Sequence, residues 1–127
     1  MKIRKDFVTN SSSSSYIVAS KDDELIKEIK RLVKKISKTD YDTEYFRTMK
    51  TQEEVDSVIP TNLFYKDSLE LMFNGNDHAR ELYTNVSKAI KEEKTVSYFY
   101  LGYHATGKNV DKLNDVLYKT TIISSEN

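Results

Sequence analysis

The chain of 127 residues contains no cysteine and no tryptophan, and it has one proline and three glycines. The absence of cysteine excludes disulfides, iron–sulfur clusters and thiolate zinc sites, and two histidines are too few for a zinc site of another kind. We therefore predict that the protein carries no metal and no other cofactor. A cysteine-free composition also suits the reducing cytosol.

An excess of charge of either sign is also missing. Lys and Arg number 20, as do Asp and Glu, so the net charge is zero and the broad attraction to nucleic-acid backbones or anionic membranes is absent. The longest uncharged run, Phe7 to Ser20, is rich in hydroxyl groups and falls short of the roughly 20 apolar residues of a membrane span. The basic start "MKIRKDF" is not followed by the apolar stretch of a secretory signal. We expect a soluble, cytoplasmic protein that binds neither duplex nucleic acid nor membranes.

The length and the residue patterns indicate the fold class. A chain of this length matches the commonest size of one domain, which predicts a single domain over residues 1–127. Helix-like and strand-like patterns alternate along it. The prediction is an α+β fold, with a small, mostly antiparallel sheet of about five strands and three or four helices packed on it.

The most regular pattern in the N-terminal half predicts a helix over residues 21–38. Apolar residues recur there at helical spacing, and Ser20 and Asp23 have the spacing of a capping box. The lysines of this helix favour a solvated outer face over a basic binding face. Residues 41–50 are compatible with either helix or strand.

The middle of the chain predicts a short helix followed by a hairpin. Thr51 and Glu54 have the spacing of another capping box, and Pro60 is expected to end that helix. The short apolar stretches "NLFYK" and "SLELMF" are interpreted as strands that pair across Asp67. "NGND" then has the composition of a turn.

The C-terminal part predicts helix, strand, helix and strand. Asn76 or Asp77 caps a helix that ends near Lys94, and "TVSYFYLGY" is the clearest strand. A short helix over residues 109–119 and a terminal strand "TTII" follow.

Alternation on that strand places Tyr98 and Tyr100 on one face and Phe99 on the other. Alternating aromatic residues can stack on the bases of single-stranded nucleic acid, and exposed tyrosines more often contact proteins. Packing within the core is the commoner role, and it is the one we favour here.

The stretch "FVTNSSSSSYIVA", Phe7 to Ala19, is interpreted as two strands joined by a serine-rich turn. Two alternatives remain. Ser11 to Ser15 are either a flexible tip, or a hydroxyl-rich loop that binds an anion or takes a modification.

The same stretch resembles a motif found near the N-terminus of many small proteins of low-GC bacteria and their phages, a largely uncharacterised set. Their usual version, FVSNSSSSSF, has Ser in place of Thr9 and Phe in place of Tyr16. The resemblance covers residues 1–18 and implies a bacterial or phage origin. It implies no catalytic or binding residue.

One segment has the spacing of a chemical motif. "GYHATGKN" reproduces the phosphate-binding loop, with Gly102, Gly107 and Lys108 in place and Asn109 where a Ser or Thr binds magnesium. It lies between a predicted strand and a predicted helix, which is the right context. The missing hydroxyl and the few residues after Asn109 argue against nucleotide hydrolysis.

Two interpretations of this loop stay open. It is an ordinary strand-to-helix turn, or it binds a phosphate group passively while Tyr103 stacks on a base. The candidate ligand-binding residues are Gly102, Tyr103, His104, Gly107, Lys108 and Asn109. His104 and His78 have no nucleophile beside them in the sequence, so we predict no catalytic residue.

These observations favour a binding protein over an enzyme. The leading hypothesis is a small, cytosolic, non-enzymatic binding or inhibitory protein of bacterial or phage origin that acts by contact with a partner protein. The alternative is a protein that binds or sequesters a phosphate-bearing small molecule or nucleotide through residues 102–109. The many Phe and Tyr side chains also lead us to expect a homodimer.

Overall fold

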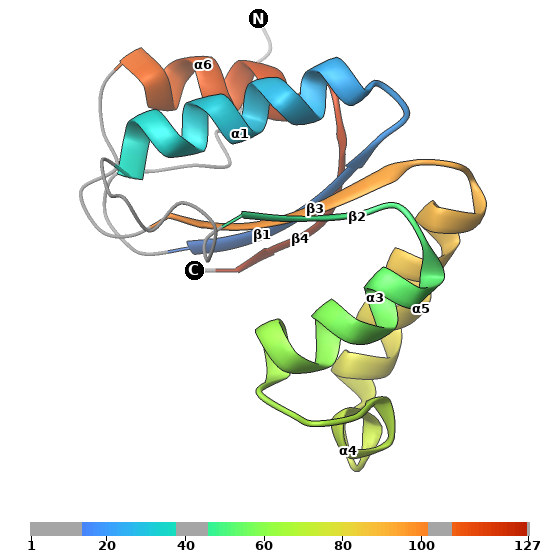
Figure 1. The fold of residues 1–127 in the computed structure, drawn as a ribbon. Coiled ribbons are helices and arrows are strands. Elements are labelled where there is room, and N and C mark those ends of the chain that lie inside the picture. The colour runs from blue at the N-terminus through green and yellow to red at the C-terminus, as the bar shows by residue number, and fades with distance from the viewer. Residues whose placement is uncertain (1–13, 38–45, 102–107, 127) are drawn as a thin grey trace, which may run out of the picture.

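The computed structural model describes residues 14–37, 46–101 and 108–126. A four-stranded antiparallel sheet lies between two layers of helices (Figure 1). The predicted α+β fold is confirmed. The described part of the chain holds fewer strands and more helices than predicted, largely because one predicted hairpin is helical.

The sheet is built from strands that are distant in sequence. They are β1 (Ser14–Ser20), β2 (Phe46–Met49), β3 (Thr95–Leu101) and β4 (Thr121–Glu126). Their spatial order is β2-β3-β1-β4, and every pair is antiparallel. β1 and β3 are therefore central, and both faces of each are available for packing.

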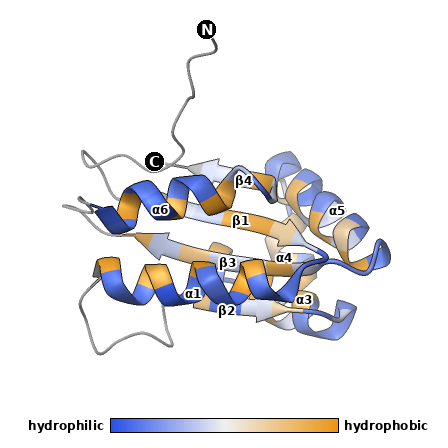
Figure 2. Ribbon diagram, turned by 90° about the horizontal axis from the view of Figure 1, so that it is seen from above, coloured by the Kyte–Doolittle hydropathy of each residue, from blue (hydrophilic) through white to orange (hydrophobic). Residues whose placement is uncertain are grey.

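The helices α1 (Asp23–Ser37) and α6 (Lys108–Leu117) cover one face of the sheet. Figure 2 shows apolar and polar residues alternating around both helices, as expected for helices with one buried side. Phe99 is at the centre of this layer: its ring stacks on Tyr16 with centroids 5.0 Å apart and on Phe46 at 6.0 Å. Leu32 and Leu113, from the two helices, are fully buried in the same cluster.

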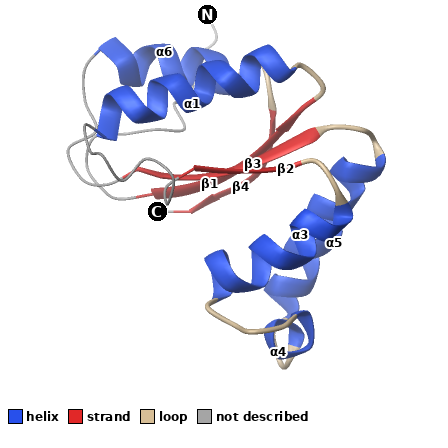
Figure 3. Cartoon of the chain, viewed as in Figure 1, coloured by secondary structure: helices blue, strands red, loops and turns tan. Residues whose placement is uncertain are grey.

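The opposite face, which we call the α5 face, carries the remaining helices (Figures 1 and 3). They are α3 (Gln52–Val58), the π-helix η1 (Ile59–Leu63), α4 (Leu69–Phe73) and α5 (Asp77–Lys91). Ile17, Ala19 and Val96 of the sheet pack here against Val55 of α3 and Val86 of α5. Strand alternation thus divides the core into two clusters, one on each face.

A polar network joins α3 to α5. The Tyr83 hydroxyl donates to Asp56 Oδ1 over 2.7 Å. Gln52 Nε2, whose NH2 group has two hydrogens to donate, lies 3.0 Å from each of three acceptor oxygens, those of Asp56, Tyr83 and Ser87. Burial, with the neighbouring Asp56 carboxylate, raises the pKa of Tyr83, so the phenol keeps the proton that it donates. The network fixes the two helices against each other, and η1 continues directly from α3.

Three helices begin near the predicted residues. The capping box of Thr51 and Glu54 is present at α3, and Asn76 caps α5 by accepting from the Ala79 N–H at 3.0 Å. The predicted helix over 21–38 is confirmed as α1, but its cap differs from the prediction. Asp22 accepts from the Glu24 N–H at 2.9 Å, whereas Ser20 accepts from the Asp22 N–H one step earlier.

The predicted hairpin across Asp67 is wrong. Ser68 accepts a hydrogen bond from the Leu71 N–H at 3.2 Å and caps α4, so "SLELMF" is helical. Pro60 does not end the preceding helix, because Val58 and Ile59 before it keep right-handed helical conformations and the chain continues through Pro60 as the π-helix η1. A capping serine and a tolerated proline therefore override the strand-like composition.

The strand predictions hold elsewhere. "YIVA" lies in β1, most of "TVSYFYLGY" forms β3, and "TTII" contributes to β4. Of residues 41–50, positions 46–49 form the strand β2. Ser14 and Ser15 of the predicted turn belong to β1, because their backbone pairs with Leu101 and Tyr100. Residues 7–13 lie outside the described part of the chain.

Candidate functional site

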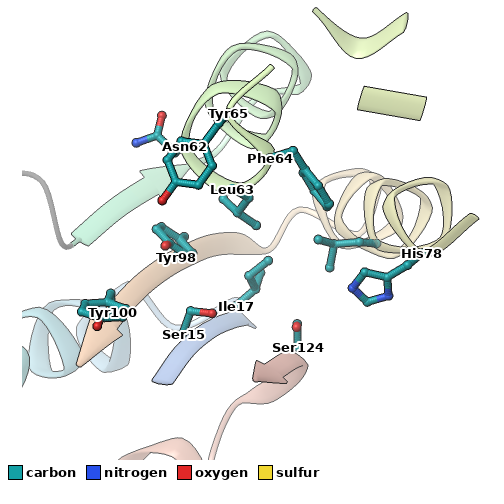
Figure 4. A pocket seen from close by; sticks show the side chains of 11 residues that line it. Ser15, Ile17, Asn62, Leu63, Phe64, Tyr65, His78, Tyr98, Tyr100 and Ser124 are labelled. Atoms are coloured by element: carbon teal, nitrogen blue, oxygen red, sulfur yellow. The ribbon is translucent and has the colours of Figure 1, made fainter. Parts of the chain in front are cut away.

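A cavity of about 240 Å³ opens on the α5 face, between the sheet, the end of η1 and the start of α5 (Figure 4). The residues that line it are Ser15, Ile17, Asn62, Leu63, Phe64, Tyr65, His78, Leu82, Tyr98, Tyr100 and Ser124. We call it the tyrosine pocket. Three tyrosines from two parts of the chain meet there.

The sheet supplies the floor of the pocket through strand alternation. Tyr98 lies opposite Ile17, and Tyr100 lies opposite Ser15, so these side chains point to one face. Ser124 joins them because a register shift in the β1–β4 pairing places it opposite Ile17. The predicted division of the β3 aromatics is confirmed, with Tyr98 and Tyr100 on this face and Phe99 in the core on the other.

The wall of the pocket comes from the end of η1. The backbone N–H groups of Phe64 and Lys66 both donate to the Pro60 carbonyl, which closes the helix. Between them Tyr65 has a φ of 54°, in the left-handed region that a residue with a large side chain seldom adopts. Its side chain is 88% exposed. The chain thus turns sharply and leaves an aromatic ring at the mouth of the pocket (Figure 4).

The interior of the pocket favours neutral groups. Burial raises the pKa of Tyr98, and the neighbouring phenols of Tyr65 and Tyr100 raise it further. Tyr98 therefore keeps its proton and offers a neutral hydroxyl. Of the described residues that line the pocket, none is Asp, Glu, Lys or Arg. Hydroxyl, amide and imidazole groups provide the polar contacts beside the rings.

His78 lies in the first turn of α5, and its exposed side chain reaches the mouth of the pocket. Leu82, one turn further along α5, also lines the cavity and is 6% exposed. Nothing in the sequence indicated that this end of α5 borders a cavity.

The predicted phosphate-binding residues are only partly described. Lys108 is exposed at the first position of α6, and Asn109 is half-buried beside it. Gly102, Tyr103, His104 and Gly107 lie outside the described residues, so phosphate binding stays a prediction. The flanking elements are as predicted, because β3 ends at Leu101 and α6 follows the loop.

The part of the pocket that sequence reasoning missed is residues 62–65. The hairpin prediction assigned them to a strand, whereas the wall is formed by the turn that closes η1. The available signals were Pro60, which is common in first helical turns, and the capping serine at position 68. Both signals favour helix on either side of Tyr65.

A second cavity of about 290 Å³ lies beside β4, where Ala89 and Lys88 of α5 face Ile122 and Ile123. Within residues 14–37, 46–101 and 108–126, no three side chains of the metal-binding types gather. In the same ranges no helix has the length and apolar character needed to cross a membrane.

No family model, curated protein or solved structure matches this chain.

Proposed function

We propose that this chain is a non-enzymatic, cytoplasmic binding protein of bacterial or phage origin, and that it acts by occupying a partner protein. One side chain of the partner enters the tyrosine pocket. The observation that carries the proposal is the pocket itself, in which Tyr65, Tyr98 and Tyr100 surround a neutral cavity with an exposed ring at its mouth.

The size of the cavity suits a side chain better than a free ligand. At about 240 Å³ it is smaller than the usual small-molecule pocket, which measures roughly 300–1,000 Å³. Protein interfaces, in contrast, are commonly anchored by one or two side chains that fill pockets of the partner. Tyrosine is enriched in such interfaces because its ring packs and its hydroxyl forms hydrogen bonds.

The exposure of Tyr65 also favours a protein partner. A ring that is 88% exposed contributes little packing to the isolated chain, and its backbone conformation is unfavourable. A partner that covers the mouth of the pocket would bury this ring. The burial would add binding energy at the centre of the contact, where interface residues contribute most.

The proposal can be tested by selecting peptides from a random displayed library on the immobilised, full-length chain. Affinities of the selected peptides are then measured by calorimetry against wild type, Ser124→Phe and Ser125→Phe. Ser124 lines the pocket, so a phenyl group there occupies it. Ser125 is exposed on the same strand opposite Tyr16, on the other face of the sheet, and serves as the matched control.

We expect Ser124→Phe to weaken peptide binding about tenfold or more, which corresponds to about 1.4 kcal/mol. Ser125→Phe should leave the affinity unchanged. The proposal fails if no peptide is enriched, or if the enriched peptides bind Ser124→Phe as tightly as wild type.

Phosphate binding by residues 102–109 is the second candidate, and the position of Lys108 favours it. Lys108 is exposed at the start of α6, directly after the loop, where a helix N-terminus adds to the attraction for an anion. Calorimetric titration with mono-, di- and cyclic nucleotides should give heat that Lys108→Ala reduces and that salt weakens. Absent heat, or heat that the substitution does not change, would remove this candidate.

A further inference from the structure

We infer that the side chain held in the tyrosine pocket is a neutral aromatic ring, clamped between the rings of Tyr65 and Tyr98. The inference rests on the proposed function and names the chemistry of the partner's anchoring residue. It is carried by the position of Tyr65 relative to Tyr98 (Figure 4) and by the conformation of Tyr65.

The first step concerns what Tyr65 does in the free chain. Its ring is 88% exposed, and within the described part of the chain it forms no hydrogen bond and stacks on no other ring. It does interact with Tyr98, whose pKa its phenol helps to raise. Figure 4 shows the two rings on the same side of the pocket, and the exposure of Tyr65 leaves its ring open to an occupant.

The second step concerns the backbone. The φ of 54° at Tyr65 is a conformation for which Gly, Asn and Asp are the usual residues. Tyrosine is unfavourable in this conformation, and its exposed ring makes few packing contacts that would offset the cost to the stability of the fold. Unfavourable backbone conformations of this kind concentrate at ligand-binding sites, and π-helical turns such as η1 do as well. The occupant of the pocket supplies the packing that the free chain lacks.

The third step decides the chemistry of the occupant. The exposed ring of Tyr65 and the half-buried ring of Tyr98 lie on the same side of the pocket (Figure 4), and they favour a planar group, because aromatic rings gain from stacked and edge-to-face contacts beyond their buried area. Asn62 and Ser124 can accept from an indole N–H or a phenol hydroxyl at the edge of the ring.

A cationic occupant is the main alternative, because tyrosine faces also attract Arg and Lys. The structure disfavours it in two ways. The described lining offers no carboxylate to pair with a buried cation. The β2–β3 register also pairs Arg47 with Tyr98, so a cationic residue is already the strand neighbour of Tyr98 and would repel a second cation bound there.

The test uses small amides as probes of the full-length protein. The chain has no tryptophan, so indole emission from N-acetyl-tryptophanamide reports on the probe alone. N-acetyl-leucinamide and N-acetyl-argininamide are compared with it by calorimetry. The variants are Tyr65→Asn, which removes the ring and suits the left-handed backbone, and Tyr65→Phe, which keeps the ring.

We expect the tryptophan amide to bind wild type and Tyr65→Phe within about twofold of each other, with a dissociation constant on the order of millimolar. Tyr65→Asn should weaken binding about fivefold or more, and its thermal midpoint should equal or exceed that of wild type by about 1–4 °C. The leucine and arginine amides should bind at least about fivefold more weakly.

The inference is overturned if Tyr65→Asn binds the tryptophan amide like wild type, if either other amide binds as tightly, or if no amide binds. A Tyr65→Asn variant that binds poorly and is also less stable than wild type would show that the ring supports the fold, and would overturn it too. The proposed function is tested separately, by the peptide selection. If the tryptophan amide binds through Tyr65 but no peptide is enriched, the aromatic binding site is supported and the proposed protein partner is rejected.

Discussion

Asp23 joins three elements at one edge of the fold. Its carboxylate accepts from the Thr95 hydroxyl at 2.8 Å and pairs with Lys50 Nζ at 3.3 Å, so the start of α1 is tied to the start of β3 and the end of β2. The hydrogen bond from Thr95, followed by the contacts with Lys50, lowers the pKa of Asp23 below its ordinary value of 3.8.

The lowered pKa of Asp23 predicts a pH dependence of stability. The folded state binds the Asp23 proton less readily than the unfolded state, so the stabilisation is fully present above pH 3.8 and is lost as the pH falls through the lower, folded value. We expect Asp23→Asn to unfold at a lower temperature than wild type near pH 6, with a difference that narrows below about pH 4.

Thermal unfolding followed by circular dichroism across this pH range checks the prediction. Asp67→Asn is the matched control, because Asp67 is exposed and forms no hydrogen bond or ion pair with the described residues. A gap between wild type and Asp23→Asn that stays constant with pH would contradict the role given to the carboxylate.

Among the elements, α1 shows how the helical spacing of apolar residues in the sequence predicts which side chains are buried in the core. Leu32 is fully buried in the cluster under α1 and α6, whereas Lys30, two positions earlier, is exposed. Leu32→Ala should cost about 2–5 kcal/mol in the free energy of unfolding, because the removed methyl groups leave a cavity. Lys30→Ala should change it by less than about 0.5 kcal/mol. Chemical denaturation measures both, and a loss below about 1 kcal/mol for Leu32→Ala would place that face outside the core.

The elements that could be predicted from the sequence are those whose local signals agree. In α1, α5 and β3, periodicity, caps and residue preference all point to one structure, and each lies close to its predicted bounds. Residues 62–73 carry conflicting signals, because apolar β-type residues stand beside a first-turn proline and a capping serine. The Ser68 cap decides that conflict in favour of helix over residues 69–73, which is why the hairpin prediction fails.

The tyrosine pocket could be predicted only in part, for a related reason. The alternation of residues along β3 is a local property of the sequence, and it suffices to place Tyr98 and Tyr100 on one face. Their neighbours in the pocket come from β4 and from the end of η1, and no local pattern specifies which distant segment lies beside a strand. The left-handed backbone at Tyr65 is equally hidden, because tyrosine is not a residue type that indicates a positive φ.

At the scale of the whole molecule, we expect a homodimer. The chain has nine tyrosines and five phenylalanines, and Leu71 and Tyr118, which do not line the tyrosine pocket, remain 52% and 41% exposed. Self-association is the commonest way for a small domain to cover such surface. Light scattering at micromolar concentration should give twice the mass of one chain. A mass of one chain would contradict the prediction.

The arrangement of the sheet also predicts which end of the chain the fold depends on. β1 lies between β3 and β4, and its residues contribute to both core clusters: Tyr16 and Val18 on one face, Ile17 and Ala19 on the other, each no more than 2% exposed. β4, in contrast, pairs only with β1 among the described strands.

Deleting residues 1–19 should therefore abolish cooperative unfolding. Without β1 the pair β2–β3 loses its link to β4, and α1 and α5 lose the central surface on which they pack. Deleting residues 124–127 is the matched control: it shortens the outer strand, removes no residue of either cluster, and should leave a cooperative transition at a lower temperature. Thermal unfolding followed by far-ultraviolet circular dichroism distinguishes the two, since a cooperative transition at the wild-type temperature after deletion of 1–19 would mean that β1 is dispensable.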